Sequence, residues 1–176
     1  QKKLASIFME TEKWLNILGV GEVASLNEKL LNGDLTNIIM VSEALHEKKL
    51  AEIADKIFCR RNTRIVLIAG PSSSGKTTFA NRLAIHLRVN GLVPIPISLD
   101  DYFVNREQTP IDENGEYDFE TIGSVDIKLF NSQLRDILKG EEVEIPTFNF
   151  LTGKREWTGN KIKLPQNGVV IIEGIH

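Results

Sequence analysis

The chain has 176 residues, of which 41% are hydrophobic and 26% are charged, and this composition is ordinary for a soluble globular protein. The formal net charge is −3 without a dense basic cluster, so we expect no nucleic-acid partner. No apolar run approaches the roughly 20 residues of a membrane span, and no signal peptide opens the sequence, so we expect no membrane partner. Cys59 is the single cysteine, which excludes an internal disulfide framework and fits a cytoplasmic location.

Residues 1–62 predict a helical segment, which we assign as the first domain. Apolar residues recur at helical spacing from Leu4 to Leu18, and Gly19 is a suitable stop. A second short helix is expected over residues 23–31. A third, longer helix is expected from about residue 42 to Phe58.

From residue 64 the pattern changes to alternating strands and helices, and we assign residues 63–176 to a second, α/β domain. The expected central strands are 65–69, 93–99 and 169–172, and the expected helices are 75–90 and 126–139. Residues 104–124 are rich in turns, and short strands are expected at 142–145, 155–158 and 161–164. Strands joined by helical crossovers predict a parallel sheet that binds ligands at the carboxyl ends of its strands.

The segment GPSSSGKT, residues 70–77, matches the phosphate-loop pattern G-x-x-x-x-G-K-[ST] at every fixed position. Its glycines let backbone N–H groups point inward around an anion, and the helix that follows adds its positive dipole end. Lys76 supplies a charge for the β- and γ-phosphates of ATP, and Thr77 supplies a hydroxyl ligand for Mg²⁺. A Gly- and Ser-rich turn with a chance lysine is the alternative, at odds on the order of one in a few hundred. The residues expected to hold ATP are Gly70, Pro71, Ser72, Ser73, Ser74, Gly75, Lys76, Thr77 and Thr78.

Carboxylates follow the other two central strands. The second strand runs into Asp100 and Asp101, and the third runs into Glu173. One carboxylate at this edge can orient Mg²⁺ or its waters, and another can accept a proton from an attacking hydroxyl. A turn or a helix cap is the alternative role for one of the two aspartates. The sequence has neither a D-x-x-G switch nor an N-K-x-D motif, which argues against a GTPase and favours a small-molecule kinase.

Residues 64–176 resemble the uridine kinase/phosphoribulokinase family of P-loop kinases. The resemblance comprises the phosphate loop and the segments SLDDYF (98–103), YDF (117–119), IPTFNF (145–150) leading to Arg155, and VIIEGI (170–175). Each later motif is weak alone, but their order and spacing make the set specific. Residues 1–62 resemble more loosely the helical segment in long bacterial uridine kinase-like proteins, whose N-terminal region is similar to threonyl-tRNA synthetase accessory domains.

The resemblance implies a role for each matching residue. Asp100 matches the catalytic aspartate near Mg²⁺, with Asp101 as the alternative base, and Lys76 is the second expected catalytic residue. Glu173 completes the metal shell with Thr77 and Asp100. Asp118 matches the aspartate that holds the acceptor's hydroxyls. The other residues expected at the acceptor site are Tyr102, Phe148, Phe150 and Arg155, of which Arg155 is equally compatible with a surface charge.

The sequence departs from the family pattern in two places. Uridine kinases usually have a tyrosine and a histidine where this chain has Phe148 and Gly153, and a site loses discrimination when such hydrogen-bonding groups are absent. Uridine is therefore doubtful as the acceptor. The sequence also stops before the family's arginine-bearing helical lid, so we expect a fragment that binds nucleotide weakly and turns over little.

The sequence therefore predicts an incomplete P-loop NTPase-type three-layer α/β fold, without the lid and the later strands, preceded by a small helical segment. We expect an ATP- and Mg²⁺-dependent kinase that phosphorylates a hydroxyl of a nucleoside-like small molecule. A sugar or pentulose-phosphate kinase and a non-catalytic ATP-binding regulatory module are the alternatives. The sequence leaves the acceptor's identity and a homo-oligomeric state open.

Overall fold

The computed structural model describes residues 2–175 and divides into two compact units, Gln1–Glu52 and Ile53–His176. The boundary lies inside a helix, whereas the sequence suggested a boundary after residue 62. Within residues 2–175, no helix combines the length and the apolar character that crossing a bilayer requires.

The first unit contains helices α1 (Lys2–Leu18) and α2 (Val23–Leu31) and the first part of α3 (Leu35–Cys59). Gly19 adopts a left-handed conformation with φ 66° directly after α1, as its predicted role as a stop requires. Helix α3 begins earlier than predicted, at Leu35. Thr36 and Asn37 are weak helix formers, which masked this start, but they lie in the first turn, where their cost is small.

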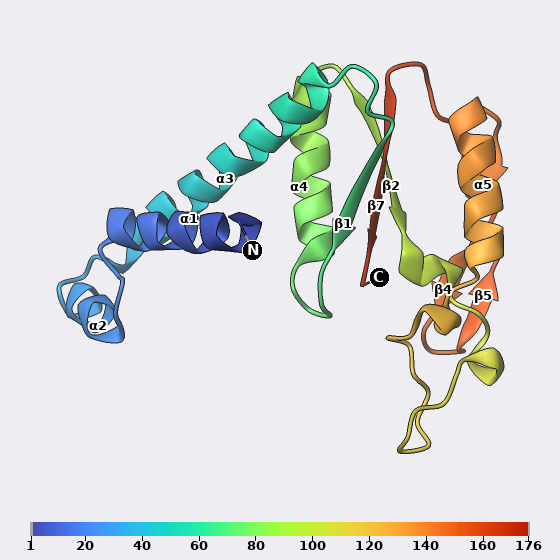
Figure 1. Cartoon of the computed structure of the whole chain (residues 1–176), viewed down its shortest axis with the longest axis horizontal. Coiled ribbons are helices and arrows are strands. Elements are labelled where there is room, and N and C mark those ends of the chain that lie inside the picture. Colours follow the sequence, from blue (N-terminus) through green and yellow to red (C-terminus); the bar gives the residue numbers. More distant parts are fainter. Residues whose placement is uncertain (1, 176) are drawn as a thin grey trace. The chain divides into compact units, whose positions relative to one another are not determined.

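The second unit is built on three parallel strands in the order β1 (Ile65–Ala69), β7 (Gly168–Gly174) and β2 (Val93–Ser98). In this register Glu173 of β7 lies opposite both Ile68 of β1 and Ser98 of β2. The three strands therefore end together at one edge of the sheet (Figure 1).

One helix covers each face of the sheet (Figure 1). Helix α4 (Lys76–Val89) packs against all three strands, and its buried side chains are Ala80, Leu83, Ala84 and Leu87. Helix α5 (Ile127–Lys139) lies on the other side, where Ile137 joins a buried cluster with Ile97, Val170 and Ile172. The predicted three-layer α/β fold is confirmed.

The connection between α5 and β7 forms two small antiparallel pairs. Strand β3 (Val143–Glu144) pairs with β6 (Lys161–Ile162), and β4 (Thr147–Asn149) pairs with β5 (Lys154–Glu156). Strand β4 was not predicted, because it has only three residues after a proline. Three 3-10 helices, η1 (Leu99–Tyr102), η2 (Arg106–Gln108) and η3 (Ile122–Ser124), complete the connection from β2 to α5.

Candidate active site

The phosphate loop connects β1 to α4. Gly75 precedes the helix with φ 84°, and Ser73 also has a positive φ of 57°. Left-handed residues curl the backbone, and glycine adopts this conformation without steric strain. The Lys76 ammonium donates to the Pro71 carbonyl at 2.9 Å, so its charge lies across the loop. The local geometry is that of an anion-binding turn at a helix N-terminus.

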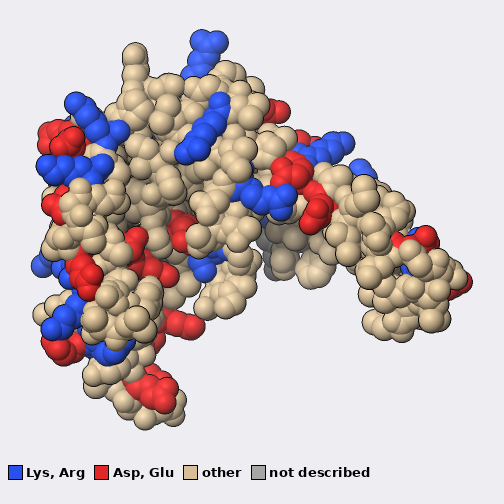
Figure 2. Space-filling model, turned by 180° about the vertical axis from the view of Figure 1, so that it is seen from behind, with Lys and Arg blue, Asp and Glu red and all other residues tan. Residues whose placement is uncertain are grey.

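The loop opens into a pocket of about 360 Å³. Its lining residues are Ser72, Ser73, Gly75, Lys76, Thr77, Thr78, Asp100, Glu173 and Ile175. The structure thus brings together most of the expected ATP-binding residues and two of the three strand-end carboxylates. On the face that Figure 2 presents, basic and acidic side chains of the described residues are interspersed.

The oxygen atoms at the back of this pocket suit a hard cation. Thr77 donates its hydroxyl to Glu173 Oε1 at 2.9 Å, and the Glu173 side chain is buried at the end of β7. Residues 2–175 contain no cluster of three or more His, Cys, Asp or Glu side chains that could hold a metal alone. A Mg²⁺ ion commonly binds to one or two carboxylates together with nucleotide phosphates, so Thr77, Asp100 and Glu173 fit a shared site.

The two neighbouring aspartates of η1 face different surroundings. Asp100 lines the pocket, and its backbone N–H donates to the Ser98 hydroxyl at 3.4 Å. Asp101 accepts a hydrogen bond from the Phe148 N–H at 3.2 Å. Burial raises the pKa of Asp101, the Phe148 N–H opposes this rise, and the Glu173 carboxylate adds to it. Asp101 therefore ties η1 to β4, whereas Asp100 faces the phosphate loop.

Aromatic rings gather beside η1 on the expected acceptor side. Phe103 contacts Phe119 and Phe148 with centroid separations of 5.3 and 5.5 Å, and Phe148 contacts Phe150 at 5.1 Å. Phe148 is buried, while Phe150 remains 58% exposed. Of the two, Phe150 therefore presents the ring that a ligand could reach.

Asp118 and Tyr102, two residues expected at the acceptor site, both form hydrogen bonds within the protein. Asp118 Oδ1 accepts the N–H groups of Glu120 and Thr121 at 2.9 and 3.2 Å, so one carboxylate oxygen holds its own turn. Tyr102 is fully buried, and its hydroxyl donates to Gln133 Oε1 at 2.8 Å. Burial and the Asp101 charge raise the pKa of this phenol well above its ordinary range. The Tyr102 ring is thus part of the core, and it supports η1 without lining the pocket.

Arg155 forms an ion pair with Asp126 at 3.0 Å, and Asp126 also caps α5 by accepting the Leu129 N–H at 3.0 Å. Burial of the Asp126 carboxyl raises its pKa, but the Leu129 N–H and the Arg155 guanidinium outweigh this and hold the pKa below its ordinary value. The ion pair of the Arg155 side chain therefore links β5 to the start of α5.

The sequence reasoning missed two residues that position the site. Ser98 caps η1, and a serine two residues before a pair of aspartates is a pattern that could have signalled a cap. Gln133 Oε1 accepts a hydrogen bond from the Tyr102 hydroxyl, and Gln133 Nε2 donates to the Glu144 carbonyl at 2.9 Å. These two hydrogen bonds link η1, α5 and β3. Nothing in the sequence around Gln133 distinguishes it from an exposed helical glutamine.

Comparisons with known proteins point to one family. The model of the phosphoribulokinase/uridine kinase family matches residues 65–176. A uridine kinase from Ureaplasma parvum is 30% identical over 112 residues, which cover 64% of this chain and 53% of that protein. A uridine kinase from Schizosaccharomyces pombe is 33% identical over 117 residues, covering 65% and 25%. The chain spans about half the length of the bacterial relatives that it matches.

Solved structures show the same fold. A possible uridine kinase from Bacillus stearothermophilus aligns with a TM-score of 0.57 at 24% identity, covering 72% of this chain and 71% of that one. A D-glycerate 3-kinase from Cryptococcus neoformans aligns with a TM-score of 0.51 at 18% identity, covering 74% and 52%. At these identities the likeness is one of fold.

Proposed function

Since the chain belongs to the phosphoribulokinase/uridine kinase family, we propose that it is part of an ATP- and Mg²⁺-dependent kinase that phosphorylates a hydroxyl group of a small, nucleoside-like molecule. The observation that carries this proposal is the convergence of the phosphate loop, Asp100 and Glu173 on one pocket. A carboxylate in the wall of the phosphate pocket favours phosphoryl transfer over storage of a nucleotide, because it could accept the proton of an attacking hydroxyl.

Lys76 and the loop N–H groups would neutralise the phosphates of the nucleotide. Asp100 would accept the proton of the acceptor hydroxyl as its oxygen bonds to the γ-phosphorus and ADP leaves. The position of Asp100 in the pocket wall supports it as the base over Asp101, which accepts a hydrogen bond from the β4 backbone. Mg²⁺ held by Thr77, Asp100 and Glu173 would supply positive charge against the phosphate oxygens.

The acceptor would lie beside η1, against Phe150 and near Phe148. Asp118 retains a second carboxylate oxygen that could accept a hydroxyl of a vicinal diol, and Arg155 and Tyr102 would act indirectly by holding β5 and η1. The uridine kinases among the relatives favour a nucleoside. Phe148 and Gly153 lack the polar groups expected for reading a pyrimidine, which favours a different nucleoside-like acceptor.

The decisive experiment is acceptor-dependent release of ADP by the full-length protein. Asp100→Asn should lower kcat by at least about 100-fold, because proton removal is typically worth that much. Binding of ATP in the absence of Mg²⁺ should change little, because the contribution of Asp100 to nucleotide binding is expected to act through the metal. ATP binding without any acceptor-dependent turnover would contradict a kinase. Residues 1–176 alone are expected to bind ATP weakly and to turn over little.

We also propose a cytoplasmic location and a small-molecule partner, in preference to nucleic acid or membrane. The small net charge of −3 supports a small-molecule partner over nucleic acid, and the single cysteine supports the cytoplasmic location. Sedimentation of the full-length protein would establish whether it forms a homo-oligomer.

A further inference from the structure

Another pocket lies at the edge of the sheet opposite the phosphate loop. Its volume is about 560 Å³, and its walls include Phe58, Cys59, Arg60, Arg61, Leu92 and Asn167, all of the second unit. These residues come from the end of α3, the turn after α4 and the position before β7, which meet at the upper end of the second unit in Figure 1. Asn167 and Glu173 are six residues apart along β7, so about 20 Å separates this pocket from the phosphate pocket.

Hydrogen bonds between separate elements fix the walls of this pocket. The Asn167 side chain donates to the Gly91 carbonyl at 2.8 Å, and the Asn167 carbonyl accepts the Val93 N–H at 3.0 Å. The Asn90 side chain donates to Asp55 Oδ1 of α3 at 2.9 Å. The end of α3, the end of α4 and the start of β7 are therefore held together without a ligand, which lowers the ordering cost of binding one.

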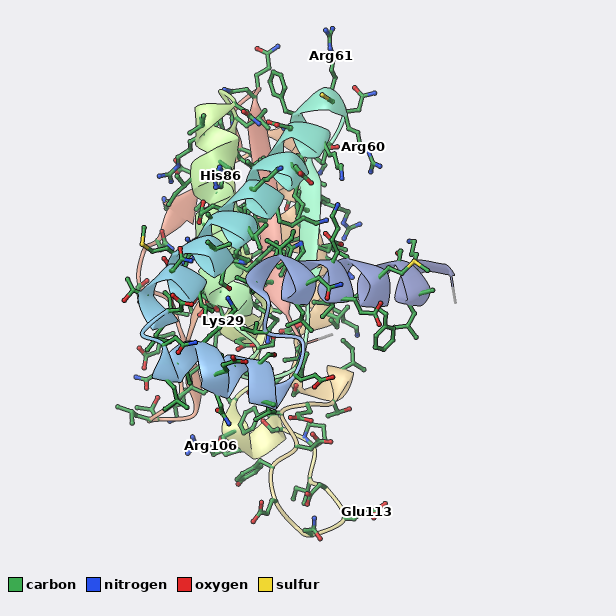
Figure 3. All side chains as sticks on the ribbon, turned by 90° about the vertical axis from the view of Figure 1, so that its left-hand side faces the viewer. Lys29, Arg60, Arg61, His86, Arg106 and Glu113 are labelled. Carbon is green, nitrogen blue, oxygen red and sulfur yellow. The ribbon has the colours of Figure 1, made fainter. Side chains whose placement is uncertain are left out.

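The charge around the pocket is positive. Arg60 and Arg61 form no ion pair with any residue of the described range 2–175, and Figure 3 shows both side chains projecting from the end of α3. Arg64 follows them in the chain, and its buried Nε has no hydrogen-bond partner among the described residues. The C-terminal dipole of α3 attracts these cations but leaves their N–H donors unused. The planar donor fork of a guanidinium fits a phosphate group.

The remaining wall of the pocket is apolar. The Phe58 side chain is 51% exposed beside the two arginines, and Leu92 adds a second, partly buried apolar side chain. A single exposed apolar residue is ordinary, but here it shares a preformed pocket with guanidinium groups. A flat apolar group of a ligand would cover the Phe58 ring and remove it from water.

We propose that this pocket is a second ligand site, separate from the phosphate loop, and that it binds a small molecule that carries a phosphate group on an aromatic body. Arg60 and Arg61 bind the phosphate, and Phe58 and Leu92 cover the aromatic body. Because the two pockets lie at opposite ends of β7, both can be occupied at once. The inference does not depend on the proposed kinase function.

The test uses the cysteine of the pocket in the full-length protein. Cys59 is exposed, so iodoacetamide can alkylate its thiol, and peptide mass spectrometry measures the rate at this residue alone. The probe is 1-naphthyl phosphate, and inorganic phosphate and 1-naphthol represent its two parts. At saturation the probe should slow alkylation of Cys59 by at least about fivefold, because a bound molecule blocks access to the thiolate. The dependence of the rate on probe concentration gives the Kd at this pocket.

Substitutions then separate this pocket from the phosphate loop. Arg60→Gln combined with Arg61→Gln should raise the Kd of the probe at least about tenfold, because charge-assisted hydrogen bonds to the phosphate are lost. Lys76→Met, which alters the phosphate loop, should leave this Kd unchanged. Arg135→Gln is the matched control, because it changes an exposed arginine of α5 outside the pocket.

Three results would overturn the inference. The first is an alkylation rate of Cys59 in the wild type that the probe does not change, which requires no substitution. The second is a Kd that rises in Lys76→Met or in Arg135→Gln as much as in the variant lacking both arginines. The third is inorganic phosphate or 1-naphthol alone binding as tightly as the probe, because the pocket would then not recognise the combination of the two groups.

Discussion

Lys76 is the residue whose loss should affect nucleotide binding most directly. Its ammonium lies against the Pro71 carbonyl at the mouth of the phosphate loop, where it would meet phosphate oxygens. We expect Lys76→Met to weaken ATP binding at least tenfold, measured by titration with a fluorescent ATP analogue. Lys163→Met, which changes an exposed lysine outside the pocket, should leave the affinity unchanged. Equal affinities of the two variants would exclude the loop as the ATP site.

Asp101 should make the stability of the protein depend on pH. Its pKa is raised in the folded chain, chiefly by burial, so the folded state takes up the proton first as the pH falls. The ionised carboxylate lowers stability above the raised pKa, and this penalty fades as the pH falls towards the unfolded value of about 4. The free energy of unfolding of the wild type relative to Asp101→Asn should therefore rise between pH 7 and pH 4 in denaturant titrations. A constant difference would contradict the shift.

At the level of elements, the start of α5 depends on Asp126. Its carboxylate caps the helix through the Leu129 N–H and pairs with Arg155. Asp126→Ala should lower the free energy of unfolding by about 1–2 kcal/mol, mostly through the lost cap. Asp126→Asn keeps a capping oxygen and loses only a partly exposed ion pair, so about 0.5 kcal/mol is expected. If Asp126→Ala and Asp126→Asn lower the free energy of unfolding equally in chemical denaturation, the cap does not stabilise α5.

Gly153 and Arg106 should be coupled in stability. Gly153 has φ 68° and lies against the arginine, so Gly153→Ala combines left-handed strain with a steric clash and should destabilise by about 1–3 kcal/mol. In an Arg106→Ala background only the strain remains. A double-mutant cycle should therefore give a coupling of at least about 0.5 kcal/mol. Additive effects would show that the turn between β4 and β5 relaxes away from the arginine.

The elements of the second unit could be predicted well where the chain has strong periodicity and clear stops. Strand β1 matches its prediction, and α5 ends directly before Gly140, whose φ is 84°. Strand β4 and the early start of α3 could not be predicted, because a three-residue strand has no detectable period and weak helix formers conceal a first turn. The placement of β4 depends on contacts distant in sequence, such as that between Asp101 and Phe148.

The candidate site was predictable where backbone geometry determines it. The loop, Asp100 and Glu173 follow directly from the ends of parallel strands, and the structure places them around one pocket. The acceptor side depends on side-chain orientations across loops, which the sequence does not specify. The sequence therefore could not reveal that Tyr102 lies in the core. It also could not reveal that Arg106, which belongs to no motif, contacts Phe150 and Gly153.

At the scale of the whole molecule, the two compact units should respond differently to nucleotide. All pocket residues belong to the second unit, so a ligand that binds there stabilises that unit directly. We expect MgATP to slow amide hydrogen exchange in the phosphate loop and the start of α4, and to leave α1 and α2 unchanged. Chelation of the metal with EDTA should reverse most of this protection. Equal protection in α1 would show that the binding event extends to the first unit.

The pairing of β7 with both β1 and β2 makes the geometry of the site depend on the register of the strands. Side chains alternate between the two faces of a strand, so a slip of one residue would turn Glu173 away from Thr77 and bring an isoleucine or a glycine to its place. The pairs from Val93 with Gly168 to Ser98 with Glu173 all oppose such a slip. Substitutions far from the pocket that weaken this pairing, such as a proline in the middle of β7, should therefore abolish metal-dependent nucleotide binding even though every pocket side chain is retained.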